Sequence, residues 1–160
     1  MQTEKIRGWQ YERMTLSVRT IESIIQSTSP EALTTYRDGG NGWTVLQVLC
    51  HLRDFEAVFF ERARLTVEQD SPPLPFPNPD ELASSNDYEN QVLEDVLAAW
   101  KETRHAYMDF LQSRSESDWE RTAVHPKRGM LTLLEQTFIT PLHDSIHIEQ
   151  MTRILAEKLS

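Results

Sequence analysis

The sequence is short of cysteine and of long apolar runs, and each shortage excludes a class of protein. Cys50 is the only cysteine, so an intrachain disulfide and a cluster of thiolate metal ligands are both excluded. No apolar run approaches the ~18 residues that span a bilayer, and the first residues, MQTEKIRGWQ, lack the apolar segment of a signal peptide. We therefore expect a cytoplasmic protein in which Cys50 is a buried small hydrophobe rather than a reactive thiol.

Positive charge is also scarce. Lys and Arg number 16 against 25 Asp and Glu, which gives a net charge of -9 at pH 7. A surface of this sign repels nucleic-acid phosphates and anionic lipid headgroups, so neither nucleic acid nor a membrane is expected as a partner. The 160 residues are expected to form a single domain, residues 1–160, around one core.

Apolar residues recur at helical spacing in four long segments, and no segment of useful length has the period of a strand. Capping boxes mark the starts of two of them, Thr44 with Gln47 and Thr132 with Glu135. The four helices are expected over residues 11–28, 44–69, 87–113 and 132–159, with short helical turns at 31–36 and 115–121 and loops at 38–42 and 125–129. Trp9 is expected to pack at the start of the first helix and Val92 to open the core stripe of the third. The prediction is an all-α four-helix bundle.

Residues 71–80, SPPLPFPNPD, hold five prolines and are expected to form an extended crossover between the second and third helices. Two interpretations stay open for this segment. It is either a rigid connection alone or a rim that shapes access to a pocket.

The stretch from Pro141 to Met151, PLHDSIHIEQM, carries the chemistry of the last helix. His143 and His147 stand four residues apart, so both imidazoles leave one helix face, as two ligands of one metal ion do. Pro141 removes a backbone hydrogen bond and predicts a kink or bulge one turn before His143. In the alternative interpretation, a new helix begins here with Thr140 as its cap.

His51 is the candidate for a third ligand. Core faces of the second and fourth helices meet in a four-helix bundle, whereas His105 and His125 are expected on the surface. Three neutral imidazoles around one ion leave a coordination position open, which is typical of catalytic sites. Neutral imidazoles suit zinc, nickel and iron alike.

Two blocks of this sequence resemble the DinB-like family, also called DinB/YfiT-like, a family of proposed metalloenzymes. The first block runs from Gly42 to Asp54 and includes Trp43 and His51-Leu52-Arg53-Asp54. The second runs from Leu142 to Met151 and has the pattern His-x-x-x-His-x-x-Gln. The name is shared with a DNA polymerase but implies no polymerase activity.

The resemblance implies a four-helix bundle with a divalent metal ion, usually zinc or nickel, held by His51, His143 and His147. It also implies a homodimer. Characterised branches of the wider superfamily use low-molecular-weight thiols such as bacillithiol and mycothiol. From it we expect a metal-dependent transferase or hydrolase acting on a small molecule, with a water or thiol as nucleophile. The alternative is a non-catalytic metal-binding or stress-response bundle.

Three further residues are candidates for a supporting role. Metal-bound histidines usually donate their second N–H to a carboxylate or carbonyl, and Asp54 and Asp144 lie close enough in sequence to accept it. Asp144 could equally be a solvated helix residue. Gln150 could bond a metal-bound water or substrate, or be structural. The order His143-Asp144-x-x-His147 is similar to the zinc-protease pattern His-Glu-x-x-His, but the shorter Asp and the upstream His51 argue against that chemistry.

Overall fold

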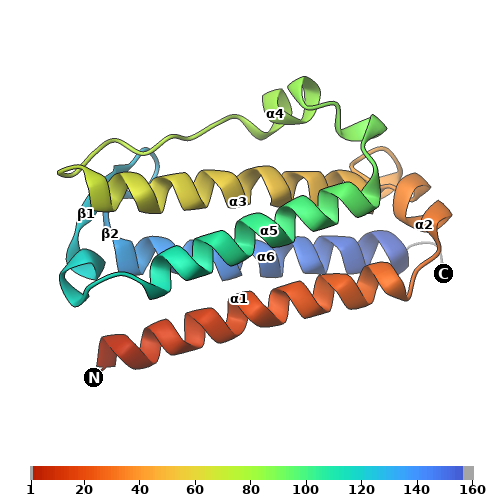
Figure 1. The fold of residues 1–160 in the computed structure, drawn as a ribbon. Coiled ribbons are helices and arrows are strands. Elements are labelled where there is room, and N and C mark those ends of the chain that lie inside the picture. The colour runs from red at the N-terminus through yellow and green to blue at the C-terminus, as the bar shows by residue number, and fades with distance from the viewer. Residues whose placement is uncertain (1, 157–160) are drawn as a thin grey trace.

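A computed structural model describes residues 2–156 and confirms the four-helix bundle (Figure 1). The long helices are α1 (Gln2–Gln26), α3 (Val45–Glu68), α5 (Leu93–Gln112) and α6 (Leu133–Ala156). Short helices connect them: α2 (Pro30–Thr35), α4 (Pro79–Ser85) and the 3-10 turns at Asp38–Gly40, Tyr88–Asn90 and Glu116–Glu120. Within the described residues, no helix has the length and apolar composition needed to cross a membrane.

The helix directions explain the long proline-rich connection. In Figure 1, α3 and α5 run the same way, opposite to α1 and α6. The chain must therefore return along the whole of α3, whose 24 residues span about 36 Å at 1.5 Å per residue. An extended chain covers about 3.3 Å per residue, so roughly eleven residues are needed, close to the ten residues (69–78) that separate α3 from α4.

The crossover is only partly as predicted. It is extended as far as Asn78, which then caps α4 through a bond from the Asp80 N–H to its side-chain oxygen. The 3-10 turn Tyr88–Asn90 follows, so the third long helix begins at Leu93 rather than near residue 87. Val92 is consequently an exposed residue at the helix start rather than part of the core stripe.

The helix starts predicted from capping boxes are confirmed. Thr44 and Gln47 exchange both bonds before α3, and Thr132 and Glu135 do the same before α6. The first helix starts earlier than predicted, at Gln2. Trp9 therefore lies within α1 and is 64% exposed instead of packing at its start.

Helix α6 passes through Pro141 as one continuous α-helix. A new helix beginning at Thr140 is therefore wrong, and no π-helical bulge precedes His143. The predicted end of this helix near residue 159 lies outside the described residues.

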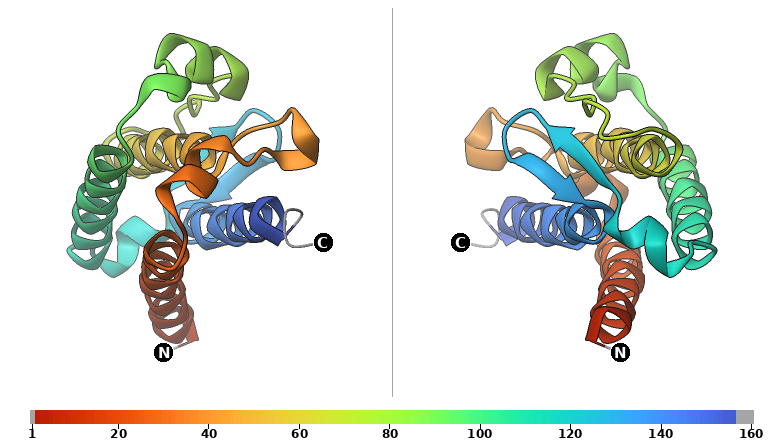
Figure 2. Two further views of the ribbon diagram at one scale, coloured as in Figure 1. Left: turned by 90° about the vertical axis from the view of Figure 1, so that its right-hand side faces the viewer. Right: turned by 90° about the vertical axis from the view of Figure 1, so that its left-hand side faces the viewer.

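A small antiparallel hairpin departs from the all-helical prediction. Strand β1 (Thr122–His125) pairs with β2 (Gly129–Thr132) in the register Thr122 to Thr132. Figure 2 shows this hairpin over one end of α3 and α6. The crossover adds a bridge, because the Leu74 N–H donates to the Val124 carbonyl and the Val124 N–H to that of Pro72.

The core has an apolar cluster towards each end of the bundle and a polar layer between them. One cluster includes Ile21, Leu49 and Trp100, and the other Met14, Phe59 and Leu111. Between the two clusters lie the buried polar residues His51, Glu56, Arg104 and Asp144. Burying such groups is costly unless each finds a partner, so this layer is where a function is to be sought.

Candidate metal centre

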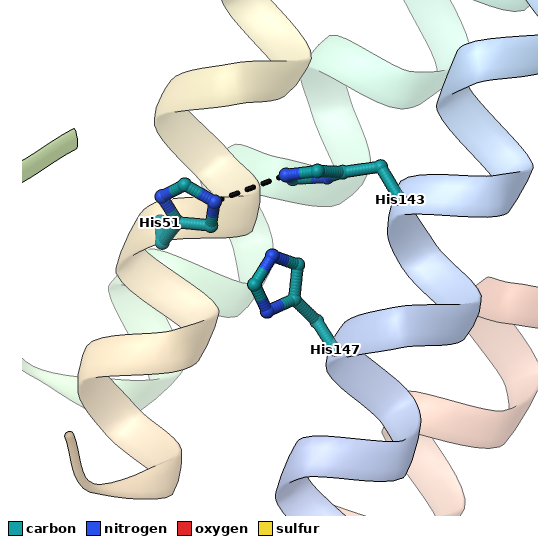
Figure 3. A group of neighbouring side chains, drawn as sticks. All are labelled: His51, His143 and His147. Atoms are coloured by element: carbon teal, nitrogen blue, oxygen red, sulfur yellow. Dashed lines mark hydrogen bonds between the residues drawn. The ribbon is translucent and has the colours of Figure 1, made fainter. Parts of the chain in front are cut away.

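The three predicted histidines meet between α3 and α6 (Figure 3). His51 projects from α3, and His143 and His147 project from successive turns of α6. One ring nitrogen from each lies within 4.8 Å of the other two, and the Nε2 atoms of His51 and His143 are 3.0 Å apart. Two nitrogens at about 2.0–2.1 Å from a tetrahedral zinc ion would be about 3.3 Å apart, so this spacing fits a shared ion.

Burial keeps these imidazoles neutral. Desolvation, with a smaller contribution from the nearby His147, lowers the pKa of His51 to about 3 and that of His143 to about 2. The pKa of His147 is lowered as well, again chiefly by desolvation. A neutral ring offers a lone pair to a cation, so all three side chains are ready to bind metal at neutral pH.

Gln150 fixes the orientation of His147. Its side-chain Nε2 donates to Asp38 Oδ2 at 3.0 Å, which turns its carbonyl oxygen to the His147 Nδ1 at 2.8 Å. Nδ1 therefore carries the ring proton, and Nε2 is left free for an ion. Arg153 holds Asp38 in turn through two bonds. Gln150 thus contacts one of the three candidate metal ligands directly.

Asp38 belongs to a tight turn whose role the sequence did not reveal. The Gly42 N–H donates to the Asp38 carbonyl at 2.8 Å. A side chain at position 42 would place its Cβ 2.6 Å from that oxygen, so the turn requires glycine here. The signal available was Gly42 beside Trp43, whose ring lies 5.2 Å from that of His51.

Replacing Gln150 by Met should weaken metal binding about 10- to 100-fold, the usual cost of removing a partner of a ligating histidine. Methionine keeps the length of the side chain but cannot accept the Nδ1 proton. Competition titration with a chelating dye measures the affinity. Thr152→Ala, at an exposed position on the same helix, is the matched control; equal affinities for the two variants would contradict the role of Gln150.

Asp54 lies in a different network from the one expected. Its carboxylate accepts bonds from Arg53 (2.8 Å), Asn86 (2.8 Å) and Tyr88 (2.7 Å), which tie α3 to the end of the crossover. The buried Nδ1 of His51 has no hydrogen-bond partner in the described part of the chain. Asp54 contributes its charge instead, which acts to raise the pKa of His51 against the larger effect of burial.

Asp144 is buried, so its interpretation as a solvated residue is wrong. Its two oxygens accept bonds from Arg104 at 2.9 and 3.0 Å, and Glu56 binds the same guanidinium at 2.6 and 2.7 Å. The remaining donor bonds the Met14 carbonyl at 3.1 Å. All five N–H groups of Arg104 are thereby used, and one side chain links α1, α3, α5 and α6.

Aromatic rings line one side of the histidine cluster. Phe55 lies 4.4 Å from His51 and 5.4 Å from His143 between ring centroids, and Phe59 lies 5.2 Å from His143. These rings keep that side of the site apolar.

For the other two histidines and the cysteine, two predictions are confirmed and one is wrong. His105 is exposed as expected, but His125 is buried at the end of β1 with 3% of its surface exposed. Cys50 is fully buried, and desolvation raises the pKa of its thiol to about 11. It is therefore a protonated core residue, as predicted.

A four-helix bundle whose polar layer holds three converging histidines defines the class of the protein: a metal-binding helical bundle. The family model described as "DinB superfamily" matches residues 13–151. The chain belongs to the DinB superfamily, and the resemblance seen in its two motif blocks is confirmed.

Individual relatives agree with this assignment. A protein of Oceanobacillus iheyensis named "Putative metal-dependent hydrolase OB0782" is 28% identical over 136 residues, covering 85% of this chain and 77% of the relative. A relative from Geobacillus kaustophilus, also named a "Putative metal-dependent hydrolase", is 30% identical over 142 residues, covering 86% and 78%.

Two solved structures share the fold. YfiT from Bacillus subtilis, described as "a probable metal-dependent hydrolase with an unusual four-helix bundle topology", aligns with a TM-score of 0.84 at 21% identity, covering 95% of this chain and 87% of that one. A mycothiol-dependent maleylpyruvate isomerase aligns with a TM-score of 0.74 at 10% identity, covering 94% and 61%.

Proposed function

We propose that this protein is a metal-dependent enzyme in which His51, His143 and His147 hold one divalent ion. The observation that carries the proposal is the convergence of three neutral ring nitrogens within 4.8 Å of one another. Among the described residues, no fourth histidine, cysteine or carboxylate joins this group. A closed structural site has four protein ligands, whereas a catalytic site keeps a position open. The geometry therefore favours an enzyme over the non-catalytic alternative.

Bound at this site, a divalent ion would supply a Lewis acid that lowers the pKa of a water or a thiol, so that it attacks at neutral pH. The chain's own residues do the positioning. Gln150 fixes the ring of His147, and Phe55 and Phe59 keep water from one side. Asp144 and Asp54 are both engaged in other bonds, so we assign them to orientation and local charge rather than to proton transfer. All-nitrogen ligation suits zinc, nickel or iron.

Hydrolysis is the first candidate reaction, because the relatives are named metal-dependent hydrolases. Transfer of a low-molecular-weight thiol is the second, because the same fold serves a mycothiol-dependent isomerase. Both reactions need the same open position and differ in the nucleophile that enters it.

The test begins with metal analysis of the purified chain and of His147→Ala. We expect one ion per chain in the parent and a marked loss in the variant. The metal-loaded parent should turn over at least one member of a panel of esters, amides, and thiol-plus-electrophile pairs with bacillithiol, mycothiol, coenzyme A and glutathione. His147→Ala should fall to the uncatalysed rate with little change in melting temperature. Melting of the variant at much lower temperature would instead indicate a structural ion.

We also propose that the expected homodimer forms through the outer faces of α1 and α6. These faces line a groove of about 270 Å³. They expose five large apolar side chains: Trp9, Leu16, Phe138, Leu142 and Ile146. Contiguous exposed apolar surface of this kind is typical of an interface. A monomeric mass in analytical ultracentrifugation would contradict this assignment.

A further inference from the structure

A cationic cluster lies close to the histidines, and no acidic side chain of the described chain pairs with it. Arg62 of α3 is only 4% exposed and forms no ion pair. Beside it stand His125 and Lys127, at the hairpin end of the bundle, and Lys127 is likewise unpaired within residues 2–156. In a chain of net charge -9, a buried arginine without a carboxylate is unexpected, because buried charges are normally paired.

The donors of this cluster are only partly used. The Nε and Nη2 of Arg62 both donate to the Pro75 carbonyl, at 2.9 and 2.7 Å. This leaves Nη1 without a hydrogen bond to any described residue. The His125 Nδ1 accepts a bond from the Lys127 backbone N–H at 3.1 Å, so in the neutral ring Nε2 is the nitrogen that carries the proton. Arg62 Nη1 and His125 Nε2 are therefore both free hydrogen-bond donors, and an anion accepts bonds from such donors.

A cavity of about 10 Å³ lies between these side chains. Arg62 and His125 line it together with Phe59, Tyr107, Gln136 and Ile139. A cavity of this volume accommodates about one water-sized atom, so it can receive one oxygen of a carboxylate. Phe76 covers the cluster, with Lys127 Nζ 4.5 Å and Arg62 Cζ 5.6 Å from its ring centroid.

Phe59 contacts both this cavity and His143. Its ring lies 5.2 Å from that of His143 on one side and 5.7 Å from Arg62 Cζ on the other. The His143 ring and Arg62 Cζ therefore lie no more than about 11 Å apart. A small molecule can span that distance.

We propose that Arg62, His125 and Lys127 form a subsite for an anionic group of the substrate, a carboxylate one of whose oxygens enters the cavity. The reactive end of the same molecule lies at the histidine cluster, of which His143 is within about 11 Å of Arg62. This inference rests on the proposed function and narrows its substrate to small molecules with an acidic tail. The competing interpretation is that Arg62 only anchors the crossover through Pro75.

The first experiment needs no metal and therefore does not depend on the proposed function. Sodium acetate is titrated into the metal-free chain at constant ionic strength, with chloride as the reference anion, while NMR follows the Arg62 Nε–H and the His125 ring. We expect saturable shifts at both groups in the parent, and Arg62→Gln should abolish the shift of the His125 ring. Arg64→Gln, at an exposed position two residues along α3, is the matched control and should leave the shifts intact.

The second experiment joins the two sites. Monohydroxamates of dicarboxylic acids, with two to six methylene groups, are titrated into the cobalt-loaded chain and followed by visible absorption, against the same hydroxamates ending in a neutral amide. A charged hydrogen bond predicts a carboxylate advantage of about tenfold or more at the chain length that fits. Arg62→Gln should abolish the advantage. Lys127→Gln, at an exposed position that cannot disturb the core, should reduce it, and Arg64→Gln should keep it.

The outcomes separate the two proposals. A chain that binds no cobalt at the histidines refutes the proposed function, and the acetate titration then decides the anion subsite alone. If hydroxamates bind the cobalt equally well with a carboxylate and with an amide end, the subsite is refuted and the proposed metal centre is not. Acetate shifts of the His125 ring that are equal in the parent and Arg62→Gln would show that Arg62 serves only the crossover.

Discussion

Replacing Arg104 by Met should lower the melting temperature by roughly 10–15 °C. The substitution leaves Glu56 and Asp144, both 1% exposed, without the guanidinium that binds them. Breaking a buried ion pair costs about 3–5 kcal/mol, and each kcal/mol lowers the melting temperature of a domain this size by about 2–4 °C. Thermal unfolding followed by circular dichroism measures the change.

Two further variants separate lost pairing from lost packing. The triple change Glu56→Leu, Arg104→Met and Asp144→Leu removes every charge of the network and should recover most of the loss, because apolar replacement of a buried ion network is often neutral or stabilising. Arg64→Met removes an exposed arginine that pairs with Glu61 and Glu68 and should change the free energy of unfolding by less than about 0.5 kcal/mol. A triple variant no more stable than Arg104→Met would contradict this account.

The pH dependence of Arg104→Met gives an internal check. Burial without a counter-charge raises the pKa of a carboxyl group, so the unpaired acids become neutral as the pH falls. The deficit relative to the parent should therefore shrink between pH 7 and pH 5.

The elements that could be predicted from the sequence are those governed by local rules. The capping box of Thr44 and Gln47 satisfies its own backbone groups whatever the rest of the chain does. The shared face of His143 and His147 follows from helix geometry alone. His51 could be added because apolar faces of two helices had to meet, which is a weak form of tertiary information.

The features that were missed depend on contacts distant in the sequence. Strands of four residues are too short to show a period, and β1 is held by its bonds to Pro72 and Leu74 in the crossover. That pairing also buries His125, which a loop assignment had placed on the surface. One local signal was overlooked: Asn78-Pro79-Asp80 has the same cap pattern as Ser29-Pro30-Glu31, which correctly predicted α2.

The buried ion network left a readable trace in the sequence. Glu56 stands beside Phe55 within the apolar pattern of α3, and Arg104 stands between Trp100 and Tyr107 in that of α5. A charged residue at a core position in each of two neighbouring helices indicates a buried pair. The sequence did not reveal that Asp144 pairs with Arg104, because its position beside His143 suggested a role at the metal site instead.

Mild acid should destabilise the metal-free protein by about 4 kcal/mol between pH 6.5 and pH 4.5. The pKa values of His51 and His143 are about 3 and about 2 when folded, against 6.5 for an ordinary imidazole. The unfolded chain therefore binds more protons than the folded one below pH 6.5. The contribution of the two neutral imidazoles to the free energy of unfolding is complete above that pH. It is lost as the pH falls towards the pKa values of the folded state. Each imidazole contributes about 2 kcal/mol over this interval, a large share of the 5–15 kcal/mol that holds a typical domain together.

Urea unfolding in the presence of a chelator, at several pH values from 7 to 4.5, measures this loss. The lowered pKa of His147 and that of His125 act in the same direction. Replacing both His51 and His143 by Gln removes the two largest contributions, so the stability of that variant should depend much less on pH above 5. Carboxylates whose pKa is lowered, such as Asp38, lose their contribution only at lower pH. Burial raises the pKa of Glu56, which acts in the opposite direction to the histidines but is common to the parent and the double variant. His105→Gln, at an exposed position, should retain the parent's slope; a double variant with that same slope would show that the buried histidines are not what links folding to protons.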